Sequence, residues 1–214
     1  METLYFTAAK QAKAEITVER SKFIAAAAHV EGREDAERFI ASVREKYRDA
    51  THNVPAFVVG EKSEIKMASD DGEPPGTAGA QVLRIIENRG LTFTAIVVTR
   101  YFGGKKLGTG GLSRAYSEAA ALALDAAGKA LAVRKDRLFV SCDYSDFGRL
   151  KRTKALAGAD IRHEEYGTSV SFELICGAED SERFAAVIRD ATAGKAKIEH
   201  REIFVDLEPY EDAR

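Results

Sequence analysis

The stretch TAIVVTRYFGGKKLGTGGLSR, residues 94–114, determines how the first half of the chain folds. It opens with β-branched residues, a composition typical of a buried strand. Glycines follow, and a helix is predicted from Gly111 to about Ala127, with alanines recurring along one face. The pattern predicts a strand that turns through a flexible loop into a helix packed closely on a sheet.

The remaining segments of the first half also favour a sheet covered by helices. Strands are predicted at residues 4–6, 15–19, 22–30 and 55–60, and helices at 33–47 and 77–88. In the first of these helices the apolar residues Ala36, Phe39, Ile40, Val43 and Tyr47 fall on one face. Thr77 is the expected N-cap of the second. We therefore expect a mixed domain over residues 1–132.

The second half alternates strands and helices in a recognisable order. Strands are predicted at residues 138–144, 161–166, 169–176 and 198–207, and helices at 145–157 and 181–193. Ser145 or Asp146 would cap the first helix, and Gly158 and Gly194 would end the two helices. The order β-α-β-β-α-β is the split βαβ pattern of ferredoxin-like domains. The predicted fold class is thus α+β, with a second domain over residues 136–214 and a boundary near residues 128–135.

Composition excludes several classes of protein. The 214 residues are 45% hydrophobic and 31% charged, as in ordinary globular chains. No apolar run approaches the roughly 20 residues of a membrane-spanning helix, and residues 1–15 do not resemble a secretory signal. We expect a cytoplasmic protein without a membrane partner.

Charge is divided unequally along the chain. The net charge is -2, but residues 1–135 hold 20 basic and 17 acidic side chains, whereas residues 136–214 hold 12 and 17. An anion-binding surface is therefore expected in the first half.

The glycine-rich loop carries the first candidate site. Its cations, with no acidic residue among them, are Arg100, Lys105, Lys106 and Arg114. The N–H groups at the start of the following helix favour anions, and Tyr101 and Phe102 could stack on a base. The loop is not a Walker A motif, because Thr109 follows Gly108 where that motif needs lysine. Contact with phosphate or RNA backbone and a merely solvated basic rim both fit this pattern.

The acidic turn DDGEPPGT, residues 70–77, is the second candidate. Asp70, Asp71 and Glu73 offer oxygens of the kind that Mg²⁺ or Ca²⁺ prefers, but the spacing is not that of an EF-hand. An acidic surface turn that precedes a helix is the favoured interpretation, and a binding surface is the alternative. We predict no metal here.

His52 is the third candidate, because it precedes a predicted strand and could join the acidic turn. A capping or hydrogen-bonded role is the alternative. The sequence shows no nucleophile with an ordered base, so no catalytic residue and no cofactor is predicted.

These segments resemble the signature of the YigZ/IMPACT family. In the first half the matching motifs are SKFIA (21–25), THN (51–53), DDGEPPGTAG (70–79) and VVTRYFGGKKLGTGGLSRAY (97–116). In the second half CDYSDFG (142–148) and TAGKAKIE (192–199) resemble the small C-terminal domain of bacterial YigZ-type members.

The resemblance implies both fold and function. The family's N-terminal domain is similar in fold to domain IV of elongation factor G and to GHMP kinases, and its C-terminal domain is ferredoxin-like. Eukaryotic IMPACT proteins bind the activator of a translation-regulating kinase. The resemblance therefore implies a regulatory or binding protein that contacts RNA, the ribosome or a translation-related protein. A protein-docking regulator without nucleic acid and an enzyme acting on a nucleotide or phosphorylated small molecule remain alternatives.

The candidate ligand-binding residues come from the loop, the acidic turn and the histidine. They are Arg100, Tyr101, Gly103, Gly104, Lys105, Lys106, Gly108, Gly110, Gly111, Arg114, His52, Asp70, Asp71 and Glu73.

Overall fold

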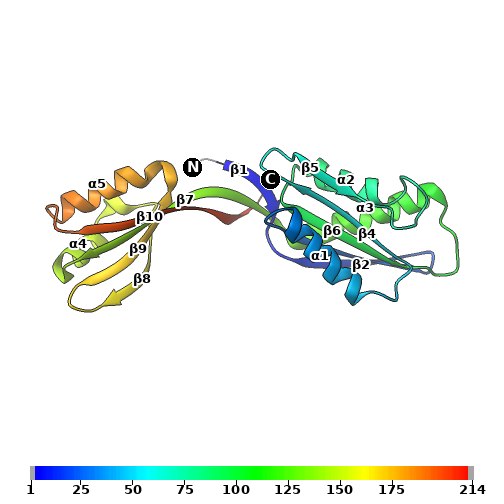
Figure 1. The fold of residues 1–214 in the computed structure, drawn as a ribbon, viewed down its shortest axis with the longest axis horizontal. Coiled ribbons are helices and arrows are strands. Elements are labelled where there is room, and N and C mark those ends of the chain that lie inside the picture. Colours follow the sequence, from blue (N-terminus) through cyan, green and yellow to red (C-terminus); the bar gives the residue numbers. More distant parts are fainter. Residues whose placement is uncertain (1–2, 212–214) are drawn as a thin grey trace. The chain divides into compact units, whose positions relative to one another are not determined.

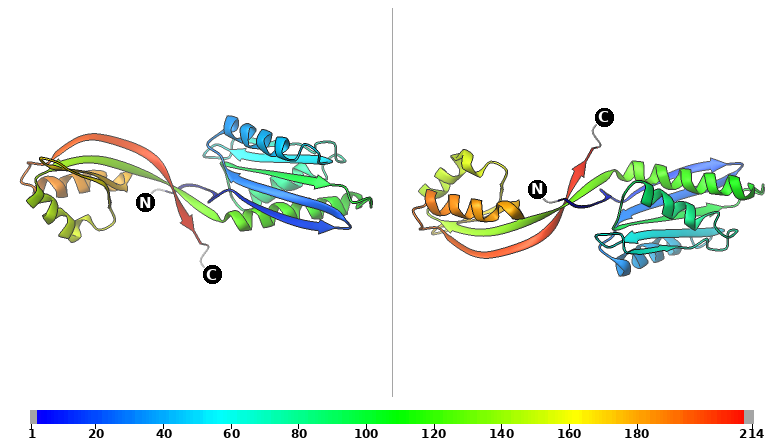
Figure 2. Two further views of the ribbon diagram at one scale, coloured as in Figure 1. Left: turned by 90° about the horizontal axis from the view of Figure 1, so that it is seen from below. Right: turned by 90° about the horizontal axis from the view of Figure 1, so that it is seen from above.

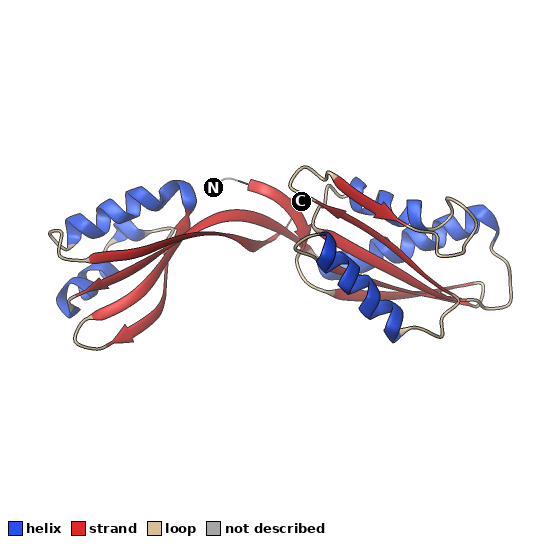
Figure 3. Ribbon diagram, in the orientation of Figure 1, coloured by secondary structure: helices blue, strands red, loops and turns tan. Residues whose placement is uncertain are grey.

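The structure, a computed structural model, describes residues 3–211 and divides into two compact units. The N-terminal unit holds Tyr5–Leu131 together with residues 207–211, and the C-terminal unit holds Ala132–Asp206 together with residues 3–4. Each unit combines a sheet with helices (Figures 1 and 3), so the predicted two-domain α+β fold is confirmed.

The N-terminal unit is built on an antiparallel sheet in the order β2-β3-β6-β4-β5. Its strands are β2 (Ala12–Val18), β3 (Ser21–His29), β6 (Thr94–Tyr101), β4 (His52–Val59) and β5 (Ile65–Ala68). Its helices are α1 (Arg33–Lys46), α2 (Gly79–Asn88) and α3 (Gly108–Ala127). β6 is the strand at the start of residues 94–114. It lies in the middle of the sheet and is buried over almost its whole length.

Helices cover both faces of this sheet (Figure 2). Alternate residues of β3 and β6, such as Ala25 and Val98, pack with α2 and α3, while their neighbours Ala26 and Val97 pack with α1. Because the side-chain period of a strand is two, a strand buried on both faces reads as an unbroken apolar run. The small side chains of β3 and the alanine face of α3 allow the helix to lie close to the sheet.

Several predicted boundaries in this unit shift. α3 begins at Gly108, not Gly111, because packing of Leu107 and Leu112 on the core outweighs the low helix propensity of the glycines. β5 was not predicted, since it is short and mostly exposed at the edge of the sheet. Thr77 does not cap α2: its hydroxyl donates to the backbone oxygen of Pro74 at 2.7 Å.

The C-terminal unit has the predicted β-α-β-β-α-β order. Its elements are β7 (Lys129–Cys142), α4 (Tyr144–Arg152), β8 (Asp160–Tyr166), β9 (Val170–Gly177), α5 (Ser181–Ala191) and β10 (Lys197–Tyr210). β7 pairs with β9 on one side and also with β10, and β9 pairs with β8, which gives the sheet order β10-β7-β9-β8 of a ferredoxin-like domain. β1 (Thr3–Ala8) also pairs with β7.

One face of this sheet forms the core of the unit. Alternate residues of β7 and β9, including Leu138, Val140 and Phe172, pack against Phe147 of α4 and Phe184 of α5. This alternation is the signal on which the strand predictions depended.

The first helix of the second half is shorter than predicted and has a different N-cap. The predicted helix 145–157 ends at Arg152, because Thr153 is extended and the chain continues as a short 3-10 turn, Lys154–Leu156. Neither Ser145 nor Asp146 is the N-cap; that position belongs to Asp143. The chain passes from one unit to the other between Leu131 and Ala132, within β7 and within residues 128–135.

Candidate functional site

The acidic turn and the glycine-rich loop meet at one end of the N-terminal sheet. His52 at the start of β4 lies opposite Arg100 near the end of β6, so the segments next to both strands share this edge. The acidic turn connects β5 to α2, and the glycine-rich loop connects β6 to α3 (Figure 1).

Glu73 is the centre of the contact between the two segments. Its Oε1 accepts a hydrogen bond from Nη1 of Arg100 at 2.6 Å and another from the hydroxyl of Tyr116 at 2.7 Å. The side chains of Glu73 and Arg100 are only 3% and 6% exposed. Burial, followed by the hydrogen bond to the carboxylate, raises the pKa of Tyr116, which therefore stays protonated as a donor. The turn, the end of β6 and α3 are thus joined by buried charge-assisted bonds.

Arg100 lies beneath the loop and supports it. Its guanidinium lies 5.5 Å from the ring centroids of both Phe23 and Phe102. Nη2 donates to Oγ of Ser21 at 3.4 Å, and the same oxygen accepts the N–H of Gly103 at 3.1 Å. Within the described residues Nε of Arg100 has no hydrogen-bond partner. In this position Arg100 holds the loop in place and does not offer its charge to solvent.

Asp70 organises the acidic turn and the start of α2. Its carboxylate accepts the backbone N–H groups of Gly76, Ala78 and Gly79 at 2.8, 3.0 and 2.8 Å. Partial burial raises the pKa of Asp70, but these three donors outweigh it and the net pKa is lowered. Asp70 therefore performs the capping role that the sequence reasoning gave to Thr77.

Asp71 and His52 fix the turn to the sheet. Asp71 accepts the N–H of Asn53 at 2.7 Å and a bond from Arg44 at 3.0 Å. Nδ1 of His52 donates to the backbone oxygen of Asp71 at 2.7 Å, which leaves Nε2 facing Glu73 at 3.9 Å. Of the roles considered for His52, the structure shows a hydrogen bond, and this bond attaches the side chain to the acidic turn.

The exposed part of the loop carries the remaining cations. Lys105, Lys106 and Arg114 are exposed, and Nζ of Lys105 lies 2.6 Å from a carboxylate oxygen of Glu19. Tyr101 is half-buried, and its hydroxyl donates to Asp49 at 2.9 Å. The predicted group of four cations is therefore divided, since Arg100 is buried and paired while the other three lie at the surface.

The loop positions that hold glycine do so for different structural reasons. A Cβ at Gly103 would lie 2.1 Å from the backbone of Arg20, so only glycine fits there. Gly104 and Gly108 have positive φ values of 85° and 69°. Gly110 and Gly111 lie in the first turn of α3, where no described side chain caps the helix.

The acidic residues have separate partners within the chain. Among the described residues no group of three His, Cys, Asp or Glu side chains is placed to hold a metal ion. Four residues that shape the site were not among the candidates, namely Ser21, Arg44, Asn53 and Tyr116, and Phe102 was named only as a ring that could stack. All of them except Arg44 lie within the motifs that carry the family resemblance. Membership of those motifs is the signal by which the sequence could have identified them.

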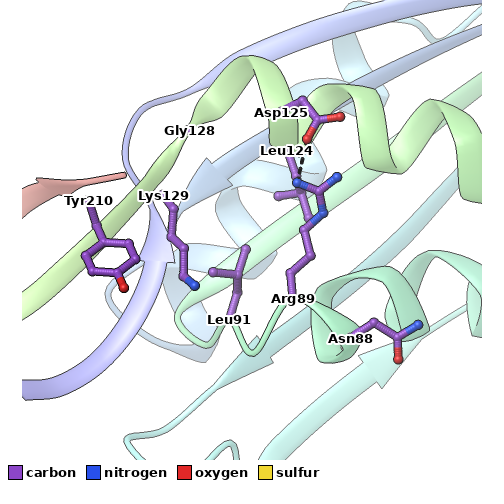
Figure 4. A pocket seen from close by; sticks show the side chains of 8 residues that line it. All are labelled: Asn88, Arg89, Leu91, Leu124, Asp125, Gly128, Lys129 and Tyr210. Atoms are coloured by element: carbon purple, nitrogen blue, oxygen red, sulfur yellow. Dashed lines mark hydrogen bonds and ion pairs between the residues drawn. The ribbon is translucent and has the colours of Figure 1, made fainter. Parts of the chain in front are cut away.

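A separate pocket of about 550 Å³ lies at the C-terminal ends of α2 and α3 (Figure 4). In it Arg89 pairs with Asp125 at 2.6 Å, and the ammonium of Lys129 lies 4.0 and 5.1 Å from the ring centroids of Phe6 and Tyr210. None of the predicted candidates lines this pocket, and its residues form no motif in the sequence.

Within the described chain, no helix is both long and apolar enough to cross a membrane.

Comparison with known proteins agrees with the motifs in both halves. Residues 19–124 match the family model of the Impact N-terminal domain, and residues 140–195 match a domain of unknown function, DUF1949. The IMPACT family member YvyE of Bacillus subtilis is 35% identical over 199 residues, which cover 93% of this chain and 92% of that protein. The IMPACT family member YigZ of Escherichia coli is 31% identical over 85% of this chain and 90% of its own length.

A solved structure supports the same relationship. The crystal structure of a hypothetical protein covers 100% of both chains with 29% identity and a TM-score of 0.62. Because these relatives are 35% and 31% identical over 93% and 85% of this sequence, the chain belongs to the YigZ/IMPACT family.

Proposed function

We propose that this chain is a translation-associated binding protein that contacts RNA, including RNA of the ribosome, through its basic loop. By the basic loop we mean residues 102–114. The association with translation comes from the family, whose eukaryotic IMPACT members act in translational regulation. The assignment to RNA depends on the chemistry of the loop.

The observation that carries the proposal is a rigid loop with exposed positive charge. The buried pair of Arg100 and Glu73 fixes the end of β6, and Gly103 packs against the backbone at Arg20. The side chains of Lys105 and Lys106 are therefore exposed on a fixed support, and Nζ of Lys105 pairs with the exposed carboxylate of Glu19. Phosphate contacts of this kind supply most of the sequence-independent affinity for nucleic acid.

The start of α3 adds to this surface. Its first turn contains Gly108, Thr109, Gly110 and Gly111 and carries no acidic residue. Unpaired N–H groups at the start of a 20-residue helix favour an anion, and Arg114 is exposed one turn further along.

The site favours RNA over the two alternatives. A Mg²⁺-dependent enzyme would need carboxylates free to bind the metal, but Asp70, Asp71 and Glu73 are engaged with groups of their own chain. A protein-docking face built jointly from acidic and basic groups is disfavoured because Glu73 is buried and Asp70 and Asp71 bind groups of their own chain, whereas Lys106 and Arg114 are exposed.

Sedimentation with purified ribosomes at 50 and 200 mM salt tests the proposal. We expect binding that weakens with salt and is lost in the variant Lys105→Ala/Lys106→Ala. The variant Lys10→Ala/Lys62→Ala is the matched control, because it removes the same charge from exposed lysines next to the opposite end of the same sheet. Equal binding by both variants, or binding that survives digestion of the RNA, would overturn the assignment to RNA.

A further inference from the structure

We infer that the basic loop takes unpaired RNA, and that Phe102 is the platform on which a base stacks. This inference rests on the proposed function and adds to it the class of RNA and the residue that selects it.

Phe102 presents an aromatic ring to solvent within a cationic loop. It is 47% exposed, which leaves much of the ring accessible to a ligand. It directly follows β6, and Lys105 and Lys106 come three and four residues later. A base on the ring would therefore lie near cations that can reach its phosphates.

The ring is held in place. The backbone N–H of Phe102 donates to Oγ1 of Thr51 at 3.0 Å, which ties the loop to the residue before β4. The guanidinium of Arg100 lies 5.5 Å from the ring centroid, and Arg100 is itself fixed by Glu73. A platform that is already ordered loses little conformational entropy when a base stacks on it.

Phe102 is better placed for stacking than its neighbour. Tyr101 is half-buried and its hydroxyl is bound to Asp49, so its ring is committed to the chain. The sequence pattern named both rings, and exposure distinguishes them.

An exposed ring of this kind selects for unpaired bases. In an RNA duplex the faces of the bases are stacked on one another, and proteins contact the phosphates and 2′-hydroxyls instead. A single strand offers each base face to an aromatic side chain while its phosphates reach nearby lysines. The combination of ring and lysines therefore fits a single-stranded loop or end better than a helix.

Fluorescence anisotropy with the full chain tests this inference. The probes are a fluorescein-labelled RNA 12-mer of mixed sequence and the blunt duplex that it forms with its complement, at 100 mM salt. The protein forms are the unaltered chain, Phe102→Ala, Phe102→Tyr and Tyr166→Ala. Tyr166 is the matched control, because its ring is 60% exposed in the C-terminal unit.

We expect the single strand to bind at least ~10-fold more tightly than the duplex. Phe102→Ala should weaken single-strand binding by roughly 5- to 100-fold, as expected for the loss of one stacked base. Phe102→Tyr, which keeps a ring, and Tyr166→Ala should bind as the unaltered chain does. Thermal melting of Phe102→Ala should show an intact fold, because Phe102 is 47% exposed.

The possible failures are distinguishable. If single strand and duplex bind equally, and Phe102→Ala changes neither while Lys105→Ala/Lys106→Ala weakens both, the inference is wrong and the proposed function stands. If the unaltered chain binds neither RNA, the proposed function fails and the inference fails with it.

Discussion

Nη1 of Arg100 lies 2.6 Å from Oε1 of Glu73, and both side chains are almost completely buried. The two residues are 27 positions apart, and each lies in a separate signature motif of the family. Their contact joins the acidic turn to the last residues of β6, from which the basic loop begins. The acidic motif therefore supports the loop, and the loop carries the exposed charge.

Removal of Glu73 should destabilise the protein strongly. Glu73→Ala leaves the guanidinium of Arg100 buried without its carboxylate and removes the acceptor of Tyr116. We expect the free energy of unfolding to fall by about 3–5 kcal/mol, measured by urea denaturation. The double variant Glu73→Leu/Arg100→Met should cost less than the single change, because neither charge is then left alone. A loss below about 1 kcal/mol in Glu73→Ala would show that the pair does not hold the turn.

Asp70 should stabilise the fold at neutral pH and lose this effect in acid. Asp70→Ala leaves three backbone N–H groups without their acceptor, and a loss of about 1–2 kcal/mol is expected at pH 7. The pKa of Asp70 in the folded state lies below its ordinary value of 3.8, so the contribution is complete above that pH and is lost as the pH falls through the folded pKa. The difference in free energy of unfolding between the unaltered protein and Asp70→Ala, measured in urea, should therefore shrink below about pH 4. A difference that stays constant down to pH 2.5 would contradict this.

His29 should make the fold less stable in mild acid. Burial lowers the pKa of His29 below 6.5, against the opposing effect of Glu31 and Asp35. The unfolded chain therefore takes up the proton first, and stability present above pH 6.5 is lost as the pH falls toward the folded pKa. Between pH 7.5 and pH 5.5, the urea midpoint of unfolding should fall by more in the unaltered protein than in His29→Gln. Equal drops would show that His29 does not titrate in this way.

Two glycines of the basic loop should respond oppositely to alanine. Gly103→Ala would force a Cβ to within 2.1 Å of the backbone at Arg20, and we expect a clear loss of stability. At Gly110, in the first turn of α3, the nearest atom to a new Cβ is 3.9 Å away, so Gly110→Ala should be neutral or stabilise by up to about 1 kcal/mol. Thermal melts of the two variants decide this.

The RNA affinity of Gly110→Ala then separates backbone geometry from ligand contact. If RNA binding falls while stability holds, Gly110 is needed for close approach of the ligand. If both are unchanged, the glycine serves neither purpose.

The sequence predicted the architecture well where periodicity was strong. Alternation in β7 and β9 and the apolar face of α1 translate directly into buried positions such as Leu138 and Val43. Periodicity gave no warning of β5 or of the break at Thr153, because an exposed edge strand and a local change of backbone angle leave the hydrophobic pattern intact.

The site was harder to predict, because the sequence of a motif does not distinguish its buried charged residues from its exposed ones. Arg100 looks like the other cations in sequence, but it lies near the end of a buried strand and pairs with Glu73. Asp70 reaches backbone groups up to nine residues away, a relationship that a local capping rule, which selected Thr77, cannot detect.

The salt dependence of RNA binding tests the central claim most directly. The affinity for the single-stranded 12-mer should be measured from 50 to 300 mM salt for the unaltered chain, Lys105→Ala/Lys106→Ala and Lys10→Ala/Lys62→Ala. Each phosphate contact on a single strand contributes about -0.7 to the slope of log affinity against log salt. We predict that loss of Lys105 and Lys106 makes the slope shallower by about 1.4 and lowers the affinity, while the control keeps the original slope. Equal slopes in the two variants, or no binding by the unaltered chain, would contradict the proposal that this loop contacts RNA.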